Sequence, residues 1–219
     1  ESDNAAINAA LNAFPQKKHI ITTEVEHPAI RSLCFHLQEK KGYKVTFVPV
    51  DKRGRLDLDT LYSAMSEDTA IVSVMWANNE TGVIFPIAEI AQRAKEKGIW
   101  FHTDAVQATG KIPIDVKEAD VDMLSLSGHK IHAPKGIGVL YAKKGIKFSP
   151  FLIGGHQEKG RRGGTENTAS IIALGKACEL AKTNLPLMDT QVREIRDYLE
   201  TQILEAIPAT SVNGDRKNR

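Results

Sequence analysis

Apolar and polar positions along the chain repeat with two different periods. Near its start, Ile7, Ala10, Leu11 and Phe14 recur at the spacing of one helix face. Residues 69–77 form an almost wholly apolar run, as expected for a strand covered on both faces. The predicted helices are residues 2–14, 28–41, 57–65, 86–97, 167–182 and 187–207. The predicted strands are residues 19–25, 44–50, 69–77, 99–103, 121–124 and 138–142, and residues 148–162 are predicted to be irregular.

The alternation of strand and helix predicts an α/β protein with three layers, α/β/α, around a mostly parallel mixed sheet. We assign residues 1–182 to a large domain. Residues 183–219 are assigned to a connecting helix and the start of a second, small domain. Ligands of such sheets bind beyond the carboxyl ends of the strands, so functional side chains are expected there.

Polar residues follow four separate predicted strands. They are His27, Asn79, Asp104 with Gln107, and the stretch Ser127 to Lys130. Taken singly, His27 is commonly a helix-entry residue, Asn79 a turn former and Gln107 a satisfied polar group. Because strand ends meet at one edge of a parallel sheet, the whole set indicates one site more strongly than any member does.

The stretch Ser125 to Lys130, Ser-Leu-Ser-Gly-His-Lys, puts a hydroxyl, an imidazole and an amine on one tight turn. A lysine held among apolar strands loses its proton more easily, because burial disfavours the ammonium form, and it can then act as a nucleophile. Lys130 is the candidate. A single loop lysine is more often simply solvated, so the assignment depends on the residues around it.

A carboxylate paired with a pyridinium nitrogen and a lysine paired with an aldehyde are typical of pyridoxal 5'-phosphate sites, and Asp104 and Lys130 supply both. The remaining polar residues then have uses: Asn79 and Gln107 at the phenolic oxygen, Ser127 and His129 at the phosphate, and His27 on the ring. The alternative is a metal site formed by His102, Asp104 and His129. It would leave Lys130, Asn79 and Gln107 unused.

The composition is that of an ordinary globular protein, with 29 Lys and Arg against 27 Asp and Glu and a formal net charge of +2. No basic stripe is present, so direct nucleic-acid binding is not expected. No apolar run approaches the roughly 20 residues of a membrane span, and no signal peptide is recognised, so we expect a cytoplasmic protein without membrane insertion. Cys34 and Cys178 stand singly and are expected to be small core residues.

Seven stretches, in order along essentially the whole chain, resemble the cysteine desulfurases of the NifS/IscS type, within the class V aminotransferases and the fold type I pyridoxal phosphate enzymes. The resemblance implies an aspartate aminotransferase-like large domain. The stretches are residues 1–4, 23–28, 78–82, 102–107, 125–130, 134–138 and 154–165.

The resemblance also implies roles for individual residues. Lys130 and His27 are the expected catalytic residues, Lys130 forming a Schiff base with the cofactor and His27 stacking on its ring. Asp104, Gln107, Asn79, Ser127 and His129 keep the cofactor-binding roles given above. Thr165 is expected to reach the phosphate of the partner subunit's cofactor, which implies a homodimer.

The implied reaction removes sulfur from L-cysteine, giving L-alanine and an enzyme persulfide. The sulfur would pass to an acceptor protein such as an iron-sulfur scaffold, for iron-sulfur cluster assembly or tRNA thiolation. The alternatives are another class V enzyme, such as a selenocysteine lyase, or a non-catalytic scaffold or dimerisation fragment.

Two departures from the family pattern stand out. The family's catalytic cysteine lies in the small C-terminal domain, and neither Cys34 nor Cys178 matches its loop. A phosphate-binding Gly-Ala-Thr precedes the residue equivalent to Glu1 in the family. We therefore expect this chain to be a fragment without the N-terminal segment and most of the small domain. It is expected to be inactive alone, and the full-length protein is expected to be an enzyme.

Overall fold

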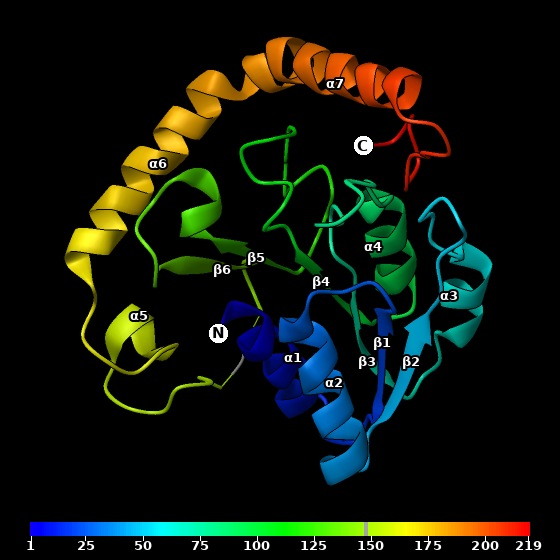
Figure 1. Ribbon diagram of the computed structural model, residues 1–219. Helices are drawn as coiled ribbons and strands as arrows, with labels where there is room; N and C mark the ends of the chain where they lie inside the picture. Colours follow the sequence, from blue (N-terminus) through cyan, green and yellow to red (C-terminus); the bar gives the residue numbers. More distant parts are fainter. Residues whose placement is uncertain (147–148) are drawn as a thin grey trace.

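A computed structural model describes residues 1–146 and 149–219, so residue 148, the first of the predicted irregular segment, lies outside the described residues. The described chain forms one six-stranded sheet in the order β2-β1-β3-β4-β5-β6 (Figure 1). The strands are β1 (His19–Thr23), β2 (Lys44–Val48), β3 (Thr69–Ser73), β4 (Trp100–Asp104), β5 (Met123–Ser127) and β6 (Gly138–Ala142). The first five are parallel to their neighbours, and β6 is antiparallel to β5.

Helices connect and flank these strands. They are α1 (Ser2–Ala13), α2 (Pro28–Lys41), α3 (Leu58–Ala64), α4 (Ile87–Glu96), α5 (Gln157–Gly160), α6 (Thr168–Leu187) and α7 (Arg193–Ala206), with the 3-10 turn η1 (Gly128–Ile131) and the π-turn η2 (Met188–Val192). No helix among them combines the length and the apolar character needed to cross a bilayer.

Two separate apolar cores cover the two faces of the sheet. On one face, Ile7 of α1 and Ile30 of α2 pack with strand residues such as Ile71. On the other face, Leu61 of α3 and Ile90 of α4 belong to a second core. Both faces are therefore buried, which explains why all five residues of β1 and of β3 are shielded from solvent. The predicted three-layer α/β/α fold with a mostly parallel sheet is confirmed.

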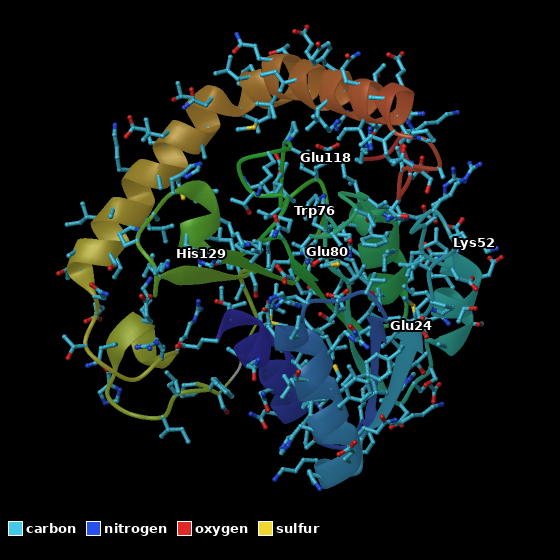
Figure 2. The ribbon with its side chains drawn as sticks, viewed as in Figure 1. Glu24, Lys52, Trp76, Glu80, Glu118 and His129 are labelled. Carbon is cyan, nitrogen blue, oxygen red and sulfur yellow. The ribbon has the colours of Figure 1, made fainter. Side chains whose placement is uncertain are left out.

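The strand that was predicted to reach residue 77 ends at Ser73. Beyond it, the Val74 and Trp76 amides donate to the carbonyl oxygens of His102 and Asp104, at 3.1 and 2.8 Å. The chain thus stays beside β4 without forming a regular ladder. This segment leads to Glu80 beyond the carboxyl end of β3, and Figure 2 labels both Trp76 and Glu80.

The two helices predicted at residues 167–182 and 187–207 are joined. Helix α6 continues through Pro186, and η2 links it directly to α7, so the pair forms a long arch over the rest of the chain (Figure 1). A proline removes one helical hydrogen bond, and a π-turn is a common way to absorb such an irregularity. The predicted domain boundary at residue 182 lies inside α6, and the division into two domains stays a prediction.

Candidate functional site

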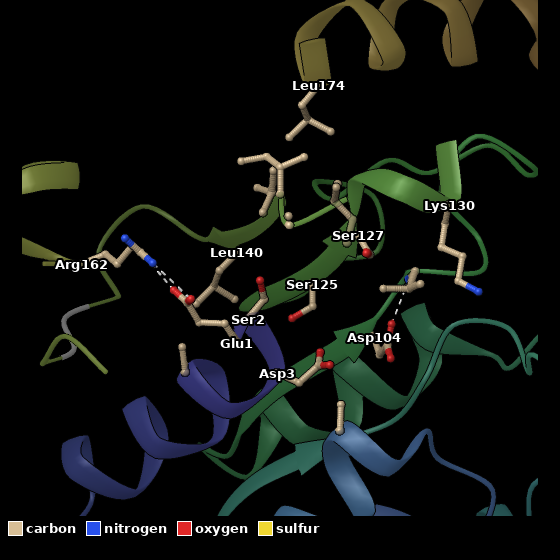
Figure 3. Close-up of a pocket in the computed structure, with 18 of the residues that line it drawn as sticks. Glu1, Ser2, Asp3, Asp104, Ser125, Ser127, Lys130, Leu140, Arg162 and Leu174 are labelled. Atoms are coloured by element: carbon tan, nitrogen blue, oxygen red, sulfur yellow. Dashed lines mark hydrogen bonds and ion pairs between the residues drawn. The ribbon is translucent and has the colours of Figure 1, made fainter. Parts of the chain in front are cut away.

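A cavity of about 1280 Å³ lies at the carboxyl ends of the central strands. It is lined by residues from α1, from the segment after β3, from the ends of β4 and β5, and from the chain before α6. All eight predicted site residues line it: His27, Asn79, Asp104, Gln107, Ser127, His129, Lys130 and Thr165. Figure 3 shows Asp104, Ser127 and Lys130 in this cavity together with Asp3 of α1. The structure brings the eight residues together, and their individual roles stay predictions.

The turn that carries Lys130 depends on Gly128. Its amide donates to the Ile137 carbonyl oxygen at 2.9 Å, which folds η1 back against the start of β6. A Cβ atom on Gly128 would stand 2.7 Å from Ile137 Cγ2 and 3.0 Å from its carbonyl oxygen. Only glycine lets the two segments approach this closely, so the Ser-Gly-His-Lys order has a local structural cause.

We expect Gly128→Ala to lower the free energy of unfolding by about 1–3 kcal/mol, the usual cost of overpacking a tight contact. Urea denaturation followed by circular dichroism measures it. The matched control is Gly175→Ala in α6, where an added Cβ meets no atom within 4 Å. That change should stabilise the chain by about 0.5–1 kcal/mol, because alanine favours a helix over glycine. A Gly128→Ala protein as stable as the wild type would contradict this account of the turn.

Lys130 is exposed to solvent on η1, so the expectation that it is held among apolar strands is wrong. The physical reason is that β5 ends at Ser127, and the next residues turn out of the sheet. Lys111 is a second amine close to it. Burial lowers the pKa of Lys111, and the positive charge of Lys130 lowers it further. Lys111 itself does not line the cavity.

Ser127 and His129 form a pair at the carboxyl end of β5. Ser127 Oγ and His129 Nδ1 are 2.9 Å apart, so the hydroxyl and the ring are fixed relative to each other. Both residues line the cavity. A hydroxyl and an imidazole at the end of a strand, beside a glycine, can bind a phosphate group.

Asp104 is a buried carboxylate of the cavity, with 5% of its surface exposed. Its Oδ1 accepts a hydrogen bond from the Val106 amide at 2.9 Å, which Figure 3 marks. Burial raises the pKa of Asp104 to about 7, and the nearby Asp3 carboxylate adds to the rise. Among the described residues it forms no ion pair. A buried carboxylate that faces a cavity without a cation fits a positively charged ligand atom, such as a protonated ring nitrogen.

The other predicted side chains are held by local contacts. His27 caps α2, because its Nδ1 accepts a hydrogen bond from the Ala29 amide at 3.2 Å. The helix-entry interpretation of His27 is thus confirmed, and its role on the cofactor ring stays a prediction. Gln107 Oε1 lies 3.4 Å from Lys111 Nζ, which leaves its NH2 group to donate elsewhere.

The residues proposed for a metal site do not form one. His102 is fully buried, with Nδ1 2.9 Å from Ser73 Oγ and Nε2 2.9 Å from Ser125 Oγ. Both ring nitrogens are therefore engaged, and burial lowers the pKa of His102 to about 4. Within the part of the chain that the structure describes, no group of three or more His, Cys, Asp or Glu side chains is placed to hold a metal ion.

The sequence pattern missed several residues of this site. Asp3 of α1 lines the cavity, and Glu26 is buried directly before His27. Arg162 Nε donates to Glu1 Oε1 at 2.8 Å and so ties the segment before α6 to the start of α1 (Figure 3). Glu1, Asp3 and Glu26 all lie in stretches that resemble the family, and Asp3 lies in the predicted first helix, but no spacing of polar residues marks any of them as part of a site.

The two cysteines lie outside the cavity lining. Cys34 is fully buried in α2, as expected. Cys178 is exposed on α6, so its expected place in the core is wrong. The helix that carries it arches away from the sheet, and only part of its surface is covered.

Comparison with known proteins gives consistent matches. The family model described as "Aminotransferase class-V" matches residues 1–219. "Cysteine desulfurase NifS" of Azotobacter vinelandii is 57% identical over 219 residues, which are 100% of this chain and 54% of that protein. The chain thus spans about half the length of the curated relatives it matches.

Two solved structures are also similar. A "NIFS-LIKE PROTEIN" has a TM-score of 0.89 and 38% identity, covering 93% of this chain and 56% of the other. A structure described as "SspA in complex with cysteine" has a TM-score of 0.77 and 39% identity, covering 81% of this chain and 52% of the other.

Proposed function

Because this chain belongs to the class V aminotransferase family, we propose that it is the pyridoxal phosphate-binding part of a cysteine desulfurase. The observation that carries the proposal is the shared cavity, which places the buried Asp104 carboxylate and the Lys130 amine at the same edge of the sheet. The identity to cysteine desulfurases supports the choice of reaction. L-Cysteine is the proposed substrate, and the related SspA was solved with cysteine.

The donor set fits the cofactor chemically. A bound pyridoxal phosphate would supply an electron-accepting ring that stabilises negative charge on the substrate's α-carbon. Lys130 would hold the aldehyde, and Asp104 would hold a proton at the ring nitrogen. Ser127 and His129 would bind the phosphate, Asn79 and Gln107 the phenolic oxygen, and His27 would cover the ring.

Asp104 and Lys130 would have separate roles in the reaction. Asp104 would keep its negative charge beside a protonated ring nitrogen, because a nearby cation lowers the pKa of a buried carboxyl. The Lys130 amine lines the cavity and would serve as the base that carries the α-proton of the substrate. The sulfur passes from L-cysteine to a thiol, leaving L-alanine and a persulfide. We propose that this thiol is neither Cys34 nor Cys178, because neither lines the cavity.

We also propose a homodimer and a sulfur-acceptor protein such as an iron-sulfur scaffold. Several apolar side chains along α6 and α7 are exposed, among them Ile172, Ile195 and Leu199. Exposed apolar surface of this kind is typical of an interface. Thr165 lines the cavity of the chain that carries it, and its reach to the partner's cofactor phosphate remains a proposal.

The proposed reaction is tested on the whole protein with L-cysteine and, separately, L-selenocysteine. We expect alanine to form from L-cysteine, and sulfide to be released when a reductant is present. Amino-acid chromatography measures the first product and a colorimetric assay the second. Turnover of L-selenocysteine without turnover of L-cysteine would contradict the desulfurase assignment and favour a selenocysteine lyase.

A further inference from the structure

Another buried acid lies next to residues that line the cavity. Glu26 has 4% of its surface exposed and follows the end of β1. Its Oε1 accepts two hydrogen bonds, from Thr23 Oγ1 at 2.9 Å and from the Met75 amide at 2.8 Å. Glu26 thus joins two segments that are far apart in the sequence, the turn after β1 and the chain after β3.

The other carboxyl oxygen of Glu26, Oε2, is buried without a hydrogen-bond partner among the described residues. Burial raises the pKa of Glu26 to about 8, and the Asp104 and Asp3 carboxylates contribute to the rise. The titratable groups that face it are Asp104 from β4, Asp3 from α1 and Cys34 from α2, and the thiol of Cys34 also has its pKa raised, to about 12, mainly by burial. The surroundings therefore favour a proton on Glu26 at neutral pH.

The two segments that Glu26 joins both reach the cavity. His27, the next residue, lines it, and so does Met75. The residue after Met75 donates its amide to the Asp104 carbonyl oxygen at 2.8 Å, which continues the connection to β4. Glu26 therefore connects the turn that carries His27, through the segment after β3, to the end of β4 that carries Asp104.

We propose that Glu26 is a positioning residue whose carboxyl group fixes the His27 turn to the segment after β3. As a neutral group it adds no further negative charge beside Asp104. Its use in catalysis rests on the proposed function, but its hydrogen bonds belong to the chain itself and can be tested without the cofactor.

The test uses Glu26→Gln and Glu26→Leu in the cofactor-free chain. Glutamine keeps an acceptor oxygen and cannot ionise, whereas leucine removes the acceptor. The His27 imidazole signal is followed by NMR between pH 6 and 10 and assigned with His27→Gln. In the wild type we expect a step near pH 8 as Glu26 loses its proton. Glu26→Gln should keep the wild-type signal at pH 7 and lack the step, and Glu26→Leu should shift the signal at every pH.

The pH dependence of the free energy of unfolding gives a second measurement, which tests the proposal even if Glu26→Leu does not fold. The folded-state pKa of Glu26 lies above its ordinary value of 4.5, so the folded wild type binds more protons between about pH 4.5 and 8. Its free energy of unfolding should therefore fall relative to that of Glu26→Gln as the pH rises through this window. The matched control is Glu24→Gln, which changes an exposed acid two residues away (Figure 2). This variant should keep both the step in the His27 signal and the fall in the free energy of unfolding with pH.

A step near pH 8 that persists in Glu26→Gln would overturn the proposal, and so would a glutamine variant whose His27 signal moves as far as that of the leucine variant. These outcomes are independent of the reaction. If Glu26→Gln behaves as expected while the whole protein produces no alanine from L-cysteine, the proposed function is at fault and the role of Glu26 in placing His27 stands.

Discussion

Lys130→Ala is expected to abolish covalent capture of pyridoxal phosphate by the chain. The Lys130 amine lines the cavity on η1, and loss of its nitrogen leaves the aldehyde without a bonding partner there. The protein is incubated with the cofactor, reduced with borohydride and digested, and mass spectrometry locates the modified lysine. Wild-type protein should carry the label on Lys130. In Lys130→Ala, the amount of labelled protein should fall to the background of unreduced samples.

Lys111 makes this test demanding, because it is the neighbouring amine and its pKa is lowered by burial and by Lys130. A lowered pKa gives Lys111 more free amine at neutral pH than an ordinary lysine has, so Lys111 is a competing nucleophile. Geometry favours Lys130, since Lys111 does not line the cavity and its Nζ lies 3.4 Å from Gln107 Oε1. Lys111→Ala should therefore keep the label on Lys130. A label that is found on Lys111 and lost in Lys111→Ala would reverse the assignment.

Much of the fold could be predicted from the sequence because burial on both faces leaves a simple signal. The apolar run at residues 69–77 marked β3, and the helical spacing at the start of the chain marked α1. The ends of elements were less well predicted. Residues 74–77 are as apolar as β3, so nothing in their pattern marked the end of the ladder. The two helices predicted at residues 167–182 and 187–207 are joined through η2, which the pattern did not indicate.

The site could be predicted to the extent that it depends on where strands end. The predicted residues at the strand ends all line one cavity, because parallel strands deliver their carboxyl ends to the same edge; they are His27, Asn79, Asp104, Ser127, His129 and Lys130. What could not be predicted is which polar groups are buried. Lys130 turned out to be exposed, while Glu26 is almost wholly buried, and both results depend on packing between segments distant in the sequence.

The second large effect is expected from Asp104→Ala in the whole protein, where turnover of L-cysteine should fall by about 10²–10³-fold, the size typical for loss of one oriented electrostatic group. The Asp104 carboxylate is buried and lines the cavity without an ion-pair partner among the described residues, so it is suited to keep a ring nitrogen protonated. Cofactor retention should fall much less, because Lys130, Ser127 and His129 remain. Steady-state kinetics measure the first quantity and equilibrium dialysis the second.

Asp122 provides the matched control for that substitution. It precedes β5 at the opposite, amino end of the strands, where its Oδ2 accepts a hydrogen bond from the Phe101 amide at 2.9 Å. Burial raises the pKa of Asp122 as it does that of Asp104, but Asp122 does not line the cavity. Asp122→Asn should therefore leave turnover unchanged. Equal losses in the two variants would mean that Asp104 acts through the stability of the sheet, whereas a loss confined to Asp104→Ala ties its charge to the reaction.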